Sequence, residues 1–172
     1  MIGSAFEVVI ALVATYGAVA LLCVFVLEGA LVGKLIPTRS LFVATVFAVG
    51  TDLVAFLPIV AAAVVGATLG QLLVFVSVRR FDVDPTESRA VPVAPDRVDG
   101  VDEWFDRWGL PAVAVSNAIP GARGWLAVPS AGSSVPASRF AAASFTGSAA
   151  YVGALAAVAV GLERAALALP GF

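Results

Sequence analysis

Long stretches without a charged residue dominate this chain, and shorter polar segments separate them. Three of these stretches reach the roughly 20 residues that a helix needs to cross a bilayer; they are residues 8–27, 53–78 and 140–162. The first resembles a signal peptide in position, but no Lys or Arg precedes it and it is longer than the usual apolar core of such a peptide. The pattern therefore predicts an all-α integral membrane protein with about three full spanning helices.

A fourth apolar stretch, residues 110–138, contains one charged side chain, Arg123, and four prolines. Proline interrupts a helix, so one unbroken helix cannot carry this stretch through a bilayer. Irregular backbone at membrane depth is tolerated only where protein surrounds it or where it lines a cavity. We therefore expect a re-entrant helical hairpin that brings Arg123 into the membrane. The alternative is a Pro-rich loop on the surface.

A second candidate hairpin covers residues 28–50, where two short apolar arms flank Pro37. Pro37 precedes Gly50 by 13 positions, and Pro120 in the later stretch precedes Gly132 by 12, so the two segments form a weak internal repeat. Inverted repeats of broken helices that meet at the bilayer midplane are a recurrent plan of transporters. Chance spacing of two prolines is the alternative, in which Glu28 merely ends the first span.

Residues 81–107 form the long polar stretch, with eight acidic residues spread along it. We expect a solvated loop followed by an interfacial helix over residues 101–108. Arg79, Arg80 and Arg89 predict that this loop is cytoplasmic, because Lys and Arg set membrane orientation and acidic residues contribute little. The loop belongs to one membrane domain that covers residues 1–172.

Composition agrees with a membrane protein: 60% of the residues are hydrophobic, 13% are charged, and the mean hydropathy is +1.01. Histidine is absent, which removes Ser-His-Asp and Cys-His chemistry and most zinc sites. A net charge of −2 without a basic patch gives no basis for binding nucleic acid. We expect no enzymatic activity, no cofactor and no metal. Glycines that permit close helix packing are Gly66, Gly70, Gly147, Gly153 and Gly161.

These features together resemble the DedA family, also called the VTT or SNARE-associated Golgi protein domain, over roughly residues 20–162. The resemblance implies two re-entrant hairpins that face each other across the bilayer. It also implies lipid translocation, either recycling of polyprenyl-phosphate carriers or phospholipid scrambling, with proton coupling proposed for some members. The residues that carry it are Phe25-Val-Leu-Glu28, Ile36-Pro37, Ala63, Gly66, Gly70, Trp108-Gly109, Ile119-Pro120-Gly121-Ala122-Arg123, Ala131-Gly132, Phe140 and Gly147.

We call the proline-containing bends of the two hairpins, around Pro37 and Pro120, the first and second elbows. The chain departs from the family pattern at two of four charged positions near these elbows. Glu28 and Arg123 keep the expected type, but Arg39 stands where the family usually has an acid, and Asn117 stands where it usually has an arginine. These changes bear on proton coupling and on the substrate. The family's final span is also not seen after residue 162, so the chain reads as a short member or as a trimmed one.

We expect Glu28 and Arg123 to meet near the midplane, because a lone charge there costs about 3 kcal/mol. Arg39 and Arg123 would present positive charge to a phosphate headgroup, and Asn117 and the backbone at Pro120-Gly121 would add donors. This interpretation predicts a multi-pass flippase or scramblase of the cell membrane whose partners are phosphate-headgroup lipids such as a polyprenyl phosphate or a phospholipid. A homo-oligomer is possible.

Two other classes of function compete with this one. A proton- or ion-coupled antiporter would use Glu28 and Asp52 as titrating carriers. A membrane scaffold without transport would use only the glycine-bearing faces of the helices.

Overall fold

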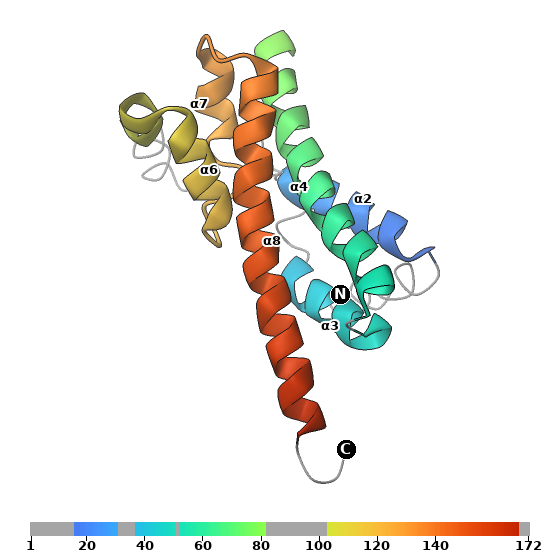
Figure 1. Cartoon of the computed structure of the whole chain (residues 1–172). Helices are drawn as coiled ribbons and strands as arrows, with labels where there is room; N and C mark the ends of the chain where they lie inside the picture. Colours follow the sequence, from blue (N-terminus) through green and yellow to red (C-terminus); the bar gives the residue numbers. More distant parts are fainter. Residues whose placement is uncertain (1–15, 31–36, 51, 82–102, 169–172) are drawn as a thin grey trace.

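The computed structural model describes residues 16–30, 37–50, 52–81 and 103–168. Regular structure in these ranges is helical, with no strand among them. The labelled helices, in chain order, are α2 Ala18–Gly29, α3 Thr38–Val49, α4 Leu53–Phe81, α6 Leu110–Ala118, α7 Ala127–Gly132 and α8 Ala137–Leu167 (Figure 1). The predicted all-helical class is confirmed.

Two of these helices, α4 and α8, are long and apolar enough to cross a membrane. They correspond to the predicted spans at residues 53–78 and 140–162. The other predicted span, residues 8–27, lies partly outside the described residues; its described end is α2, a helix of 12 residues. The first elbow, residues 31–36, also lies outside the described part of the chain, so re-entry at that hairpin stays a prediction.

Prolines mark several of the helix boundaries. Pro37 and Pro136 are the N-caps of α3 and α8, where the missing N–H costs little because no helical partner exists for it. Pro120 acts at the other end: α6 stops at Ala118, and Ile119 is extended, since the residue before a proline avoids the helical region. The predicted break in residues 110–138 is thus confirmed.

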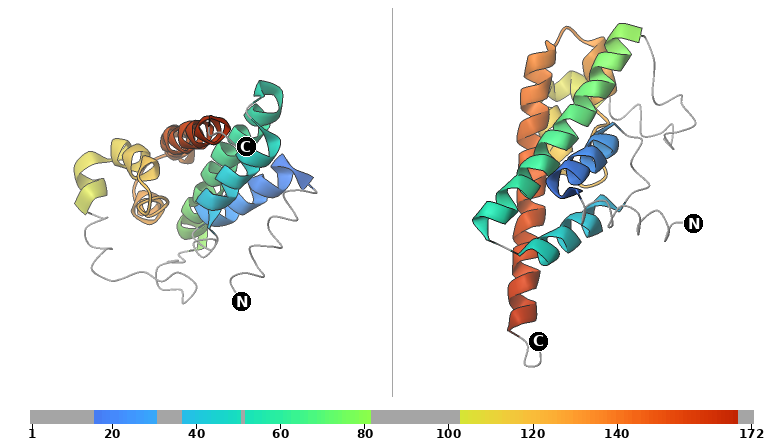
Figure 2. Two further views of the ribbon diagram at one scale, coloured as in Figure 1. Left: turned by 90° about the horizontal axis from the view of Figure 1, so that it is seen from below. Right: turned by 90° about the vertical axis from the view of Figure 1, so that its right-hand side faces the viewer.

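The two long helices lie side by side and run in opposite directions, and the shorter helices pack around them (Figures 1 and 2). We call α2, α3 and α4 the first half and α6, α7 and α8 the second half. Within each half the first short helix packs on the long one: α2 on α4, and α6 on α8. The second short helices are exchanged, since α3 packs on α8 and α7 packs on α4. Figure 1 shows α7 beside the upper end of α4 and α3 beside its lower end.

Glycines make the contact inside each half possible. A Cβ at Gly66 would meet the carbonyl oxygen of Leu22, and one at Gly70 would meet that of Val26. In the second half, a Cβ at Gly147 would meet the carbonyl oxygen of Ala114. The predicted close packing at these three glycines is confirmed.

The same prediction is wrong for Gly153 and Gly161, where no described atom lies within 4 Å of an added Cβ. Gly153 lies about 120° around the helix from Gly147, given a rotation of about 100° per residue. Gly161 lies on nearly the same face of α8 as Gly147, but it is roughly 21 Å further along the helix axis. That distance places it beyond the nine-residue α6.

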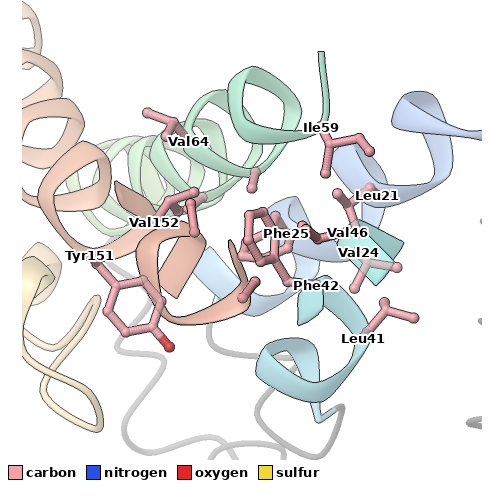
Figure 3. Close-up of a cluster of buried hydrophobic side chains, with 14 residues drawn as sticks. Leu21, Val24, Phe25, Leu41, Phe42, Val46, Ile59, Val64, Tyr151 and Val152 are labelled. Atoms are coloured by element: carbon pink, nitrogen blue, oxygen red, sulfur yellow. The ribbon is translucent and has the colours of Figure 1, made fainter. Parts of the chain in front are cut away.

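Two hydrophobic clusters fill the interior. The first joins α2, α3, α4 and α8, and in it the rings of Phe25 and Phe42 meet edge to face at 6.2 Å between centroids (Figure 3). The second joins α4, α6, α7 and α8, where Phe75 and Phe140 stack at 4.4 Å. Each cluster contains residues from both halves, so the halves share one interior.

Arg79, near the end of α4, holds α7 in place. Its guanidinium lies over the Phe75 ring, 4.3 Å from the centroid, and donates hydrogen bonds to the backbone carbonyls of Ser130, Ala131, Ser133 and Val135. These carbonyls belong to the C-terminal end of α7 and to the residues just after it, where the helix dipole leaves partial negative charge. An arginine that the sequence marked for membrane orientation therefore also has a packing role.

The predicted interfacial helix is described only in part. Residues 103–108 are helical, whereas 101 and 102 lie outside the described residues. Phe105 is buried in the second cluster, and Trp108 is 58% exposed. The charged Asp106 and Arg107 are exposed on this segment, and its place at the membrane interface stays a prediction.

Candidate functional site

The charged residues from the two elbows come together around one cavity of about 420 Å³. Glu28 lies near the end of α2, and Arg39 lies in the first turn of α3. Arg123 comes from the turns between α6 and α7. All three line the cavity, together with Gln71 of α4 and Gly121 of the second elbow. The two halves therefore contribute to one polar site inside an apolar protein.

Glu28 and Arg123 form an ion pair across the halves. Nη1 of Arg123 donates to Oε1 of Glu28 at 3.3 Å. The side chains are 9% exposed for Arg123 and 18% for Glu28, so each shields the other from an environment in which a single charge is costly. The predicted meeting of these two residues is observed.

One edge of the Arg123 guanidinium has no partner among the described residues. Nη1 is engaged by Glu28, but Nε and Nη2 are buried and unpaired. Nε–H and one Nη2–H point in parallel from the same edge of the guanidinium plane, and this fork matches two oxygens of a phosphate. Glu28 therefore binds one side of the arginine, and the Nε–H and Nη2–H pair on the other edge stays without a partner in the described part of the chain.

Tyr151 of α8 contacts both arginines of the site. Its hydroxyl accepts a hydrogen bond of 3.0 Å from Nε of Arg39, and its ring lies beneath Arg123, with Cζ 4.0 Å from the ring centroid. Sequence reasoning missed this residue because an aromatic in an apolar span ordinarily packs in a core. Its spacing offered a signal: it lies four residues after Gly147, on the face that meets α6.

Gln71 of α4 is the second residue that sequence reasoning missed. Its side chain is 1% exposed, and neither its Oε1 nor its Nε2 has a hydrogen-bond partner in the described structure. A buried amide without partners costs about 1–3 kcal/mol, and this one lines the cavity. A glutamine inside a 29-residue apolar helix was the available signal.

The prediction that Asn117 donates a hydrogen bond to a headgroup does not agree with its position, which is outside the cavity. It is 2% exposed and does not line the cavity. Its Oδ1 accepts from the Gly124 backbone N–H at 3.0 Å, and its Nδ2 donates to Oγ of Ser144 at 3.3 Å. Asn117 thus closes the second elbow and ties it to α8. Gly121 and Gly124 turn that elbow with positive φ angles of 90° and 78°, which glycine adopts readily.

The remaining predicted residues lie at the edge of the site or away from it. Pro120 is exposed beside Gly121, where it ends α6. Asp52 is exposed at the start of α4, where its Oδ2 accepts from the Val54 N–H at 3.2 Å. Asp52 is a helix-capping residue outside the cavity, and the structure does not bring it together with Glu28.

The charges around the cavity favour an anion. Arg39 and Arg123 carry two positive charges and Glu28 carries one negative charge, which leaves one positive charge uncompensated among the described lining residues. The unpaired donors of Arg123 and Gln71 add hydrogen bonds that a multi-oxygen anion can accept, beside two unpaired acceptors, Oε2 of Glu28 and Oε1 of Gln71. The arrangement suits binding of a phosphate-like group.

A family model described as the VTT domain matches residues 36–161, which is most of the chain. The match includes Arg39, Gln71, Arg123 and Tyr151. No curated protein and no solved structure matches the chain.

Proposed function

The chain belongs to the VTT domain family, the domain of DedA proteins, and from that premise we propose that it moves a phosphate-headgroup lipid across a bilayer. VTT domain proteins are membrane proteins, and two helices of this chain are long and apolar enough to span a membrane. In the proposal the chain is a multi-pass protein of the cell membrane and acts as a flippase or scramblase for a polyprenyl phosphate or a phospholipid.

The observation that carries the proposal is the cavity formed by Glu28, Arg39 and Arg123 from both halves. A headgroup phosphate would bind the unpaired edge of Arg123, with Arg39 as the second cation. The ion pair with Glu28 would keep Arg123 in place between transport cycles. The hydrocarbon tail would stay in the bilayer while the headgroup passes between the elbows.

This role requires no covalent chemistry, so we propose a transporter and not an enzyme. The antiporter alternative has less support because its two carriers, Glu28 and Asp52, lie apart, with Asp52 exposed outside the cavity. The scaffold alternative assigns no task to two arginines that converge on a cavity. The proposed partners are therefore membrane lipids.

The test is a flipping assay with headgroup-resolved lipids in vesicles that contain the purified chain. We expect the wild-type chain to flip lipids with an accessible phosphate, and Arg123→Gln to lower the rate at least about tenfold, since a charge-assisted bidentate contact is lost. The matched control is Arg80→Gln, at an exposed arginine near the end of α4 that does not line the cavity.

Equal rates for the wild-type and Arg123→Gln chains would contradict the proposal. Ion flux that does not depend on lipid headgroup would favour the antiporter. Absence of transport in the wild-type chain, with intact folding, would favour the scaffold.

A further inference from the structure

We infer that Tyr151 is a positioning residue that holds Arg39 of the first half and Arg123 of the second half for one phosphate group. The inference rests on the proposed function and deepens it, because it assigns the arrangement of the two cations to a residue of α8. Tyr151 is 6% exposed and stands at the edge of the first hydrophobic cluster (Figure 3).

The two arginines need a mediator because they are like charges around one cavity. Within the described residues, the ion pair of the site joins Arg123 to Glu28, and Arg39 has no carboxylate within ion-pair distance. Arg39 is instead tied by its hydrogen bond to the Tyr151 hydroxyl. The neutral Tyr151 side chain thus orients Arg39, which has no ion-pair partner among the described residues.

Tyrosine can engage the two cations in different ways. Its phenolic oxygen accepts the N–H of Arg39, and the negative face of its ring attracts the Arg123 guanidinium. A carboxylate in this place would orient the arginines too, but it would cancel the remaining positive charge of the cavity. Tyr151 therefore fixes both arginines and leaves their charge available to an anion.

Tyr151 lies on the same face of α8 as two residues that contact α6 of the second half, Ser144 and Gly147. Ser144 on this face bonds Asn117 of the second elbow, and Gly147 admits the backbone of α6. Residues 144, 147 and 151 are spaced by three and four, so they lie above one another on a helix. The face that seats the second elbow also places the tyrosine ring under Arg123.

The experiment compares Tyr151→Phe with Tyr151→Leu in the full chain reconstituted in nanodiscs. Tyr151→Phe keeps the ring under Arg123 and removes the acceptor for Arg39, whereas Tyr151→Leu removes both. Two quantities are measured: binding of dihexanoyl phosphatidic acid, and the rate at which phenylglyoxal modifies each arginine, followed by peptide mass spectrometry. Tyr16→Phe is the matched control, since Tyr16 is exposed at 63%, precedes α2 and does not line the cavity.

We expect Tyr151→Phe to weaken binding of the probe about fivefold, the effect of one lost hydrogen bond, and to speed modification of Arg39 and not of Arg123. Tyr151→Leu should weaken binding by a further factor of about five as the contact with the ring is lost, and should speed modification of both arginines. In an Arg39→Gln background, Tyr151→Phe should have no additional effect on binding.

Unchanged arginine reactivity in both variants would overturn the inference. The inference would also be overturned if Tyr151→Phe weakened probe binding by the same factor in the wild-type and Arg39→Gln backgrounds. A residue that acts only in packing does not depend on Arg39. A wild-type chain that binds the probe but flips no lipid would refute the proposed function while leaving the role of Tyr151 supported.

Discussion

The two halves of the molecule repeat one plan but hold their first short helix by different means. In the first half, α2 lies against α4 through Gly29, Gly66 and Gly70, each of which meets backbone atoms of the partner helix. In the second half, the one described glycine that brings α6 and α8 together is Gly147, and the hydrogen bond from Asn117 to Ser144 adds a polar tie. Close backbone contact therefore positions the acid of the site, and a hydrogen-bonded elbow positions the arginine.

The largest effect should come from breaking the ion pair that joins the halves. Arg123→Gln leaves the largely buried Glu28 uncompensated, and we expect a loss of about 3–5 kcal/mol in the free energy of unfolding. Unfolding in mixed micelles measures it. Adding Glu28→Gln to Arg123→Gln should recover much of the stability but none of the transport. Losses that simply add would show that the pair does not couple the halves.

The next largest effect should separate the two packing modes. Gly70→Ala places a methyl group against Val26, Gly29 and Ala30, and we expect it to cost about 2–3 kcal/mol. Gly147→Ala should cost a similar amount and should also displace Asn117, whose Cβ is 2.6 Å from the added carbon. It should therefore slow transport more than Gly70→Ala does at equal stability.

Gly153→Ala is the control for this pair, since it lies on α8 with open space around it. It should raise helix stability by about 0.5–1 kcal/mol. A loss at Gly153 comparable with that at Gly70 would contradict the packing explanation, because open space surrounds Gly153 and alanine favours a helix more than glycine does.

The smallest of these effects should be confined to the second elbow. Asn117→Ala removes the acceptor for the Gly124 N–H and the donor to Ser144, and we expect a loss of about 1–2 kcal/mol. Asn117→Asp keeps the acceptor and should retain part of this stability. Thermal unfolding in detergent compares the two, and an aspartate variant no more stable than the alanine variant would rule out the bond to Gly124 as the main tie.

Much of this architecture follows from the order of charges and prolines. Uncharged runs predict α4 and α8, Pro120 predicts the end of α6, and the cost of a lone charge in hydrocarbon predicts that Glu28 meets Arg123. The uncharged runs and the proline are local features of the sequence. A charge in hydrocarbon costs so much free energy that it must find a partner, which leaves few possible arrangements.

The residues that were missed depend on helix rotation and on contacts distant in sequence. Tyr151 and Gln71 sit in apolar runs, where spacing from Gly147 and a lone amide mark them as unusual but do not show that these side chains turn toward the cavity. Asn117 was expected to meet a ligand, yet its partners Gly124 and Ser144 belong to its own half. Whether an amide binds a ligand or a backbone depends on how the elbow folds, which composition does not reveal.

The exchange of α3 and α7 between the halves has a consequence for synthesis of the chain. Arg39 and its partner Tyr151 are 112 residues apart. At about 5–20 residues per second, the ribosome needs roughly 6–20 s to add that much chain. Throughout that interval α3 lacks its contacts with α8, although its contacts with α2 and α4 can form, and Glu28 exists without Arg123. The nascent first half is therefore an intermediate whose acid waits unpaired until the second half is made.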